Sequence, residues 1–144
     1  MTVKKILGAD GQAANLLIRL LVGGVFFLEG IKKFLFPEQW GVGRFTRIGI
    51  PAPSTLAPFV GVVEIVCGFL LLLGLLTRLA SIPLIIDMCV AIATTKLPIL
   101  LKHGFWPMEA EARTDYSMLL GLVFLLIAGA GPLSADGQLP QSRD

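Results

Sequence analysis

The sequence predicts an all-α protein, a four-helix transmembrane bundle that forms a single domain over residues 1–144. Its composition is the first reason: 55% of the residues are hydrophobic and 15% are charged, whereas soluble domains are about 45–50% apolar and about 25% charged. The second reason is that the apolar residues gather in segments close to the roughly 20 residues that a helix needs to cross a bilayer. Because lipid cannot hydrogen-bond an exposed backbone, such segments are expected to be helical.

Each predicted helix is bounded by residues that interrupt helical structure. The first helix ends at Pro37, the second follows the breakers in IPAPST, and the fourth ends at GAGP. Only Thr77 and Arg78 separate the second helix from the third, which predicts an antiparallel hairpin. With four crossings, both termini lie on the same side of the membrane. The predicted transmembrane helices are 14–36, 55–76, 79–101 and 115–130.

Two loops join these helices on the side away from the termini. The first, PEQWGVGRFTRIGIPAPS, predicts either a short interfacial helix or an irregular loop. In the helical version, apolar side chains face lipid and arginines face headgroups; these residues are Trp40, Phe45, Ile48, Arg44 and Arg47. The second loop ends at Thr114 and Asp115, which are natural caps for the fourth helix.

Several ionisable side chains lie within or beside the predicted helices, where a charge is costly unless it faces the bundle interior and finds a partner. At about 1.5 Å per residue, Arg19 and Asp87 lie at similar depth, which predicts a pair that Arg78 could join. Nearer the opposite side, Glu64 is expected to meet Lys33, and Lys96 to reach the surface. The candidates for ion pairing or ligand binding are Arg19, Glu29, Lys33, Glu64, Arg78 and Asp87.

Glycines accompany these charges on the same helical faces. Arg19, Gly23, Gly30 and Lys33 share one stripe of the first helix, and Gly61, Glu64 and Gly68 share one stripe of the second. Small residues allow close backbone approach between membrane helices. The charged faces are therefore predicted to be the faces where helices touch.

Other kinds of site receive no support from the sequence. Cys67 and Cys89 form no CxxC pair and no metal-ligand spacing, so packing is their expected role, and no metal site is predicted. The chain lacks a basic patch with interleaved aromatics, which excludes nucleic acid as the expected partner. It also lacks a glycine-rich phosphate loop and a nucleophile elbow.

The sequence resembles the DoxX family of small bacterial membrane proteins. The resemblance rests on RLLVGGVFFLEGIKKF, on GIPAP, on GVVEIVCGFLLLLGLLTRLAS and on the tail GPLSAD, where the family commonly shows a longer GPG-x-x-SLD form. It implies a four-helix protein of the bacterial inner membrane. It also implies a link to redox complexes, since the family takes its name from a subunit associated with thiosulfate:quinone oxidoreduction.

Three functions are consistent with these observations. The first is an accessory or scaffold subunit of a membrane redox complex, held together by a buried ion-pair network. The second is a quinone-linked oxidoreductase subunit with a polar site near Lys33 and Glu64, and the third is a small transporter. No cofactor is evident apart from a possible quinone. The expected partners are the lipid bilayer and either another protein or a second copy of the chain. Lysine and arginine divide too evenly for the positive-inside rule to decide orientation, and the resemblance favours cytoplasmic termini.

Overall fold

The computed structural model describes residues 11–140, and within them the chain is all-α, as predicted. The long helices are α2, α5, α6 and α8, and shorter helical segments lie between and after them. The elements are α2 (Gly11–Leu35), α3 (Pro37–Trp40), α4 (Val42–Arg47), α5 (Pro53–Leu73), α6 (Thr77–Ala91), the π-helix η1 (Ile92–Lys96), α7 (Leu97–His103), α8 (Phe105–Ala128) and α9 (Ala135–Gln138).

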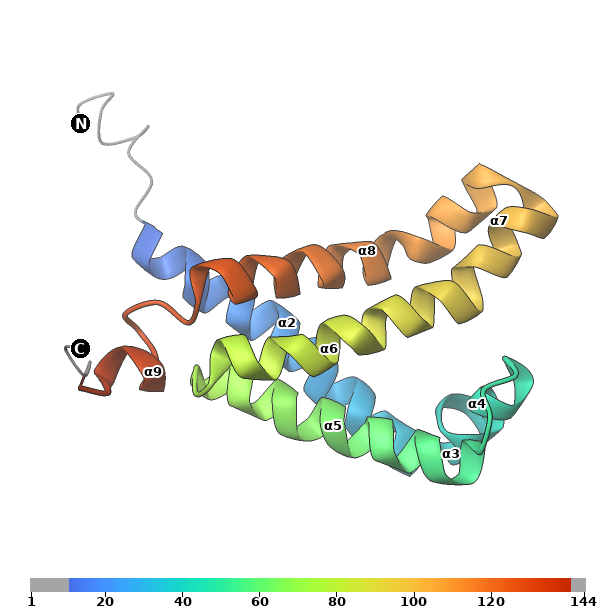
Figure 1. Cartoon of the computed structure of the whole chain (residues 1–144), viewed down its shortest axis with the longest axis horizontal. Coiled ribbons are helices and arrows are strands. Elements are labelled where there is room, and N and C mark those ends of the chain that lie inside the picture. The colour runs from blue at the N-terminus through green and yellow to red at the C-terminus, as the bar shows by residue number, and fades with distance from the viewer. Residues whose placement is uncertain (1–10, 141–144) are drawn as a thin grey trace.

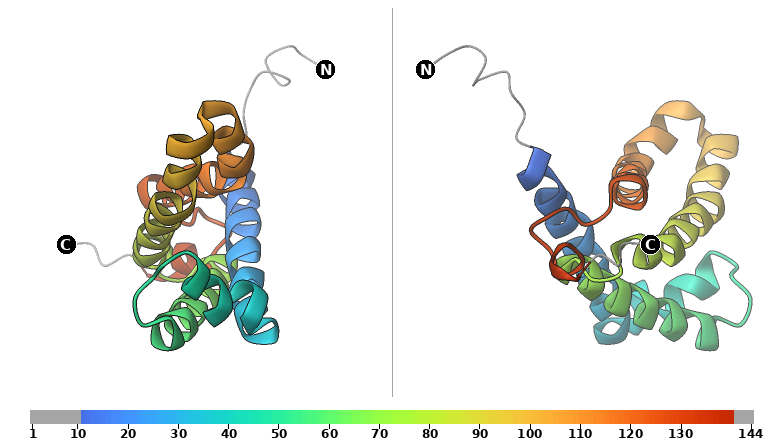
Figure 2. Two further views of the ribbon diagram at one scale, coloured as in Figure 1. Left: turned by 90° about the vertical axis from the view of Figure 1, so that its right-hand side faces the viewer. Right: turned by 60° about the vertical axis from the view of Figure 1, so that its left-hand side comes forward.

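The long helices form two packed pairs that are joined at one end. α2 runs along α5, and α6 runs along α8. A tight turn connects α5 to α6, and from this turn the two helices diverge, as Figures 1 and 2 show. We call the end with the turn and α9 the closed end, and the end with α3, α4 and α7 the open end. The buried core includes Val22, Leu71, Leu84, Leu122 and Leu125.

In the described part of the chain, three helical stretches are long and apolar enough to cross a membrane: Ala13–Leu35, Pro53–Leu73 and Thr77–His103. The third consists of α6, η1 and α7, which follow one another without a break. Large apolar side chains on the outside of the bundle, such as Leu28 and Ile127, are 64% and 73% exposed. These surfaces suit contact with lipid.

The fourth predicted segment, 115–130, falls within α8, which is not among these three stretches. Charged residues occupy the first half of α8, while its second half is apolar. A fourth crossing therefore stays a prediction. The expected caps Thr114 and Asp115 lie inside α8, so that prediction was wrong. The helix starts at Phe105 because Glu, Ala and Arg favour helix and because Pro107 in the first turn is tolerated.

Two short helices, α3 and α4, occupy the loop after α2, where a short helix was one of the two alternatives. Pro37 is the first residue of α3, where its missing N–H costs nothing. Phe45 of α4 is buried rather than turned toward lipid, which corrects the expected orientation. Arg47 donates hydrogen bonds to the carbonyls of Glu38 and Gln39 and so ties α4 to α3.

Glycines set the distance between α2 and α5. A Cβ placed at Gly30 would lie 2.7 Å from the Gly61 carbonyl oxygen, and one placed at Gly68 would lie 2.7 Å from the Phe27 nitrogen and 3.0 Å from the Gly23 oxygen. The two backbones thus touch at two levels. This arrangement confirms the glycine stripes predicted from the sequence.

The closed end is held by a turn that also differs slightly from expectation. α5 ends in a left-handed Gly74 (φ 69°), and Leu76 has φ 50°, so Thr77 and Arg78 belong to α6. A left-handed conformation is strained for leucine. The Asp136 carboxylate supports it by accepting hydrogen bonds from the backbone N–H groups of Leu76 and Thr77, at 2.8 and 3.0 Å.

Replacing Gly68 with alanine should therefore destabilise the protein, because the new methyl group meets backbone atoms that cannot move aside independently. We expect a loss of about 1–3 kcal/mol, measured by SDS titration or thermal unfolding in detergent. Gly24→Ala is the matched control, since a Cβ there meets nothing within 4 Å. Equal stability of the two variants would contradict the close helix contact.

Candidate functional site

A cavity of about 730 Å³ lies toward the open end of the bundle, between α2, α3, α4, α5, α6, η1 and α8. Its lining is mostly apolar, and pockets for small molecules commonly measure about 300–1,000 Å³. Phe59 of α5 and Ile86 and Val90 of α6 line the cavity and are also exposed on the outside of the bundle. The exposed apolar surface of α5 and α6 therefore continues into the cavity wall.

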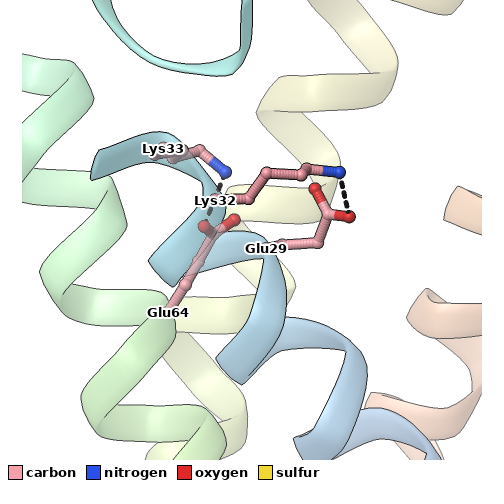
Figure 3. Close-up of polar contacts among 4 residues, drawn as sticks. All are labelled: Glu29, Lys32, Lys33 and Glu64. Atoms are coloured by element: carbon pink, nitrogen blue, oxygen red, sulfur yellow. Dashed lines mark hydrogen bonds and ion pairs between the residues drawn. The ribbon is translucent and has the colours of Figure 1, made fainter. Parts of the chain in front are cut away.

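The polar centre of the cavity wall is the ion pair between Lys33 of α2 and Glu64 of α5. The Lys33 Nζ and Glu64 Oε2 atoms are 2.6 Å apart, and the two side chains are 12% and 5% exposed. Figure 3 shows the two side chains extending toward each other from neighbouring helices. This is the pairing that the sequence predicted for Glu64.

A second ion pair lies within the last two turns of α2. Lys32 Nζ is 2.6 Å from Glu29 Oε1, and the same ammonium lies 4.0 Å from the centre of the Trp40 ring. A cation over an aromatic face is attracted by the ring quadrupole. These contacts attach α3 to the end of α2 and bring Trp40 to the cavity.

The π-helix η1 contributes a third pair. Lys96 Nζ is 3.2 Å from Asp115 Oδ2 of α8, and Lys96 is only 8% exposed. The expectation that Lys96 reaches the membrane surface was therefore wrong. Pro98 explains the local structure: it cannot donate a hydrogen bond to Thr94, and its ring crowds that carbonyl. The resulting π-turn rotates Lys96 inward, and such turns are frequent at functional sites.

The predicted pairing of Arg19 with Asp87 was also wrong. The glycine contacts place Arg19 level with the last turn of α5, because Gly23 faces Gly68. Asp87 lies ten residues into α6, roughly 15 Å beyond the turn. The prediction counted depth from the start of each helix, and so it did not include this offset of Asp87 from Arg19 along the bundle. Asp87 instead lines the cavity and is a neighbour of Glu64.

Arg19 binds backbone carbonyls at the closed end. Its guanidinium donates to the oxygens of Leu71 and Leu72 at 3.0 Å each, of Ala130 at 3.2 Å and of Leu133 at 2.7 Å. The last carbonyls of a helix lack intrahelical partners, and a cation there also suits the helix dipole. Arg19, 2% exposed, thus joins the end of α5 to the segment after α8.

Arg78, which could have joined Arg19 and Asp87, has a different partner. It donates to the Ile127 oxygen at 3.1 Å near the end of α8. Of the six candidate residues, Glu29, Lys33, Glu64 and Asp87 line the cavity, and Arg19 and Arg78 lie away from it.

Sequence reasoning missed part of the cavity wall. Trp40, Arg44 and Phe45 close the cavity from α3 and α4, and Asp115 reaches it from α8. The sequence placed Phe45 in a possible short helix, but the periodicity of that helix could not show which of its faces is buried.

Among residues 11–140, no group of three His, Cys, Asp or Glu could hold a metal ion.

The cysteines do not contribute to the cavity. Cys67 is buried in the core, Cys89 is exposed, and both are free thiols. Their different environments are consistent with the packing role expected for Cys67.

Replacing Glu64 with glutamine should destabilise the protein strongly, because it removes the carboxylate that the buried Lys33 ammonium contacts directly at 2.6 Å. Breaking a buried pair costs about 3–5 kcal/mol, which can be measured by SDS titration. Glu29→Gln is the control, since Glu29 is 42% exposed in its own pair and exposed pairs contribute about 0–1 kcal/mol. An unchanged midpoint for Glu64→Gln would contradict the pair.

Replacing Arg19 with glutamine should also lower stability, because the shorter amide can satisfy fewer of the four carbonyls. Buried groups left unsatisfied cost about 1–3 kcal/mol, and the shift appears in thermal unfolding in detergent. Arg78→Gln removes one hydrogen bond at an exposed site and should change little. Equal melting temperatures of the Arg19→Gln and Arg78→Gln variants would contradict this role of Arg19.

Comparison with known proteins gives the family. The family model described as DoxX matches residues 14–97. An uncharacterised membrane protein of Mycobacterium tuberculosis is 56% identical over 141 residues, which cover 94% of this chain and 86% of the relative. CatD of Bacillus subtilis, provisionally named an oxidoreductase, is 30% identical over 87% of this chain and 86% of its own.

A third relative, an uncharacterised protein of Haemophilus influenzae, is 34% identical over 84% of this chain and 87% of its own length. No solved structure matches the chain. The helical bundle, its three stretches suited to crossing a membrane and these matches agree with one another. The chain is a membrane protein and belongs to the DoxX family.

Proposed function

We propose that this protein binds a lipid-soluble ring compound of the quinone class in the cavity beside Lys33 and Glu64, as a subunit of a membrane redox system. The observation that carries the proposal is the mostly apolar cavity of about 730 Å³ with an ion pair in its wall. An apolar body with a few placed polar groups is the usual form of a small-molecule site. A quinone offers the matching features, an apolar ring with polar oxygens.

The route into the cavity supports a ligand that dissolves in lipid. The exposed residues Phe59, Ile86 and Val90 mark its rim on α5 and α6. A ligand that partitions into the bilayer could enter between these helices without crossing a polar surface. Trp40 would offer an aromatic face beside the ring.

The other two functions fit the structure less well. A scaffold needs paired charges and a filled interior, and here the interior is hollow at the open end. A transporter needs a path that reaches both sides. Between the cavity and the closed end, the bundle is filled by fully buried side chains such as Val22, Leu71 and Leu84.

The redox role and the membrane placement are parts of the same proposal. The name of CatD supports an oxidoreductase association, with electrons exchanged through a protein partner. We place the chain in the bacterial inner membrane with both termini in the cytoplasm. The apolar second half of α8, antiparallel to α6, supports a fourth crossing.

Tryptophan fluorescence can test ligand binding. In a Trp106→Phe background, Trp40 is the remaining tryptophan of the two in the chain, and it lines the cavity. A short-tailed benzoquinone should quench its fluorescence with saturation. Val63→Phe, which places a larger side chain in the cavity wall, should weaken the apparent affinity about tenfold or more.

Val66→Phe is the matched control, because Val66 lies on the same helix but is 50% exposed and outside the cavity lining. It should leave the titration unchanged. Quenching that never saturates, or that Val63→Phe and Val66→Phe alter equally, would mean that the quinone only partitions into the micelle.

A further inference from the structure

The lysines that line the cavity are already engaged. Lys33 pairs with Glu64 and Lys32 with Glu29, each at 2.6 Å. Asp87 also lines the cavity, and within residues 11–140 it forms no ion pair. A ligand that enters the cavity therefore meets a carboxyl group without an ion-pair partner, while the nearest ammonium groups are occupied.

Asp87 shares the positive charge of Lys33 with its neighbour Glu64. The charged groups that act on it are Glu64 and Lys33 and, more weakly, Asp115. The Lys33 ammonium balances one of the two carboxylates, Glu64 or Asp87. Lys96 is paired with Asp115, and Arg44, which also lines the cavity, lies 5.5 Å from the centre of the Trp40 ring. Asp87 is thus the carboxyl group of the cavity wall that has no ion-pair partner among residues 11–140.

A buried carboxylate is stabilised by a hydrogen-bond donor, since an ionised carboxylate has acceptor atoms only. The two redox forms of a quinone-type ligand differ in this respect. The oxidised form presents carbonyl oxygens, which are acceptors and would face the Asp87 oxygens without attraction. The reduced form presents hydroxyl groups, which can donate.

We propose that the cavity selects the reduced, hydroxyl-bearing form of its ring ligand, with the Asp87 carboxylate as the acceptor for a ligand hydroxyl. This selectivity rests on the function proposed above. It makes the protein a site for a hydroquinone, and it assigns Asp87 as the residue that sets the preference.

Three ring compounds of similar size separate this idea from simple ring binding: a short-tailed benzohydroquinone, its quinone and its dimethyl ether. They are titrated without oxygen against the protein in detergent, with Trp40 fluorescence as the readout. We expect the hydroquinone to bind about tenfold more tightly than the dimethyl ether, which lacks donors. Asp87→Leu should remove this difference while keeping saturable binding of the quinone.

Asp87→Asn keeps one acceptor oxygen without charge and should retain part of the preference. Glu109→Gln, an exposed change outside the cavity, should retain all of it. Tighter binding of the quinone than of the hydroquinone would mean that Asp87 donates a proton, and it would overturn the selectivity. Equal affinities for the hydroquinone and its dimethyl ether would also overturn the selectivity. So would a preference for the hydroquinone that persists in Asp87→Leu. Both results would leave the proposed cavity function intact. Absence of saturable binding for all three compounds would overturn both.

Discussion

A charged side chain in a hydrocarbon layer must be matched inside the protein, and the contact between α2 and α5 provides that match. Gly30 of α2 and Gly61 of α5 meet at one level. Lys33 lies one turn beyond this level on α2, and Glu64 lies one turn to the other side of it, because α5 runs the opposite way. Side chains lean toward the N-terminus of their own helix. In antiparallel helices, Lys33 and Glu64 therefore lean toward each other and converge at the glycine contact.

The same contact explains why the two ends of the molecule differ. Glycines hold α2 and α5 together along their length, while α5 and α6 share only the turn and the core beside it (Figure 1). Pro83 in α6 and Pro98 in α7 each remove a backbone hydrogen bond and favour a bend. Divergence of α6 from α5 leaves a space that side chains do not fill, and α3 and α4 cover it from one side.

Hydropathy and spacing predicted a large part of this structure. The apolar runs located the helices, and the glycine stripes identified the faces that touch. Lys33 was predicted as the partner of Glu64 from the similar depth of the two residues. Each of these features is local to one helix or follows from a strict repeat. The start of α8 was missed because charged residues were taken for a loop, although Glu, Ala and Arg are good helix formers.

The partner of Arg19 and the cavity could not be predicted in this way. Arg19 binds carbonyl oxygens, and a backbone acceptor leaves no trace in a residue pattern. Counting residues along a helix gives the position of a residue within that helix, but not how far neighbouring helices are shifted along their axes. Arg19 and Asp87 were therefore placed at the same level. A cavity depends on how far helices diverge, which several distant residues determine together. Lys96 faces inward only because a π-turn changes the helical phase by part of a turn.

The placement of buried hydrogen bonds also bears on function. At the closed end, Arg19 and Asp136 bind the backbone on both sides of the α5–α6 turn. This fixes the turn without help from the open end. At the open end, the ion pairs Lys33–Glu64 and Lys96–Asp115 join α2 to α5 and η1 to α8 beside the cavity. Helices held firmly at one end can keep a hollow at the other without collapsing into it. A site for a lipid-soluble ligand needs this combination, because van der Waals packing between the helices would otherwise favour filling the space.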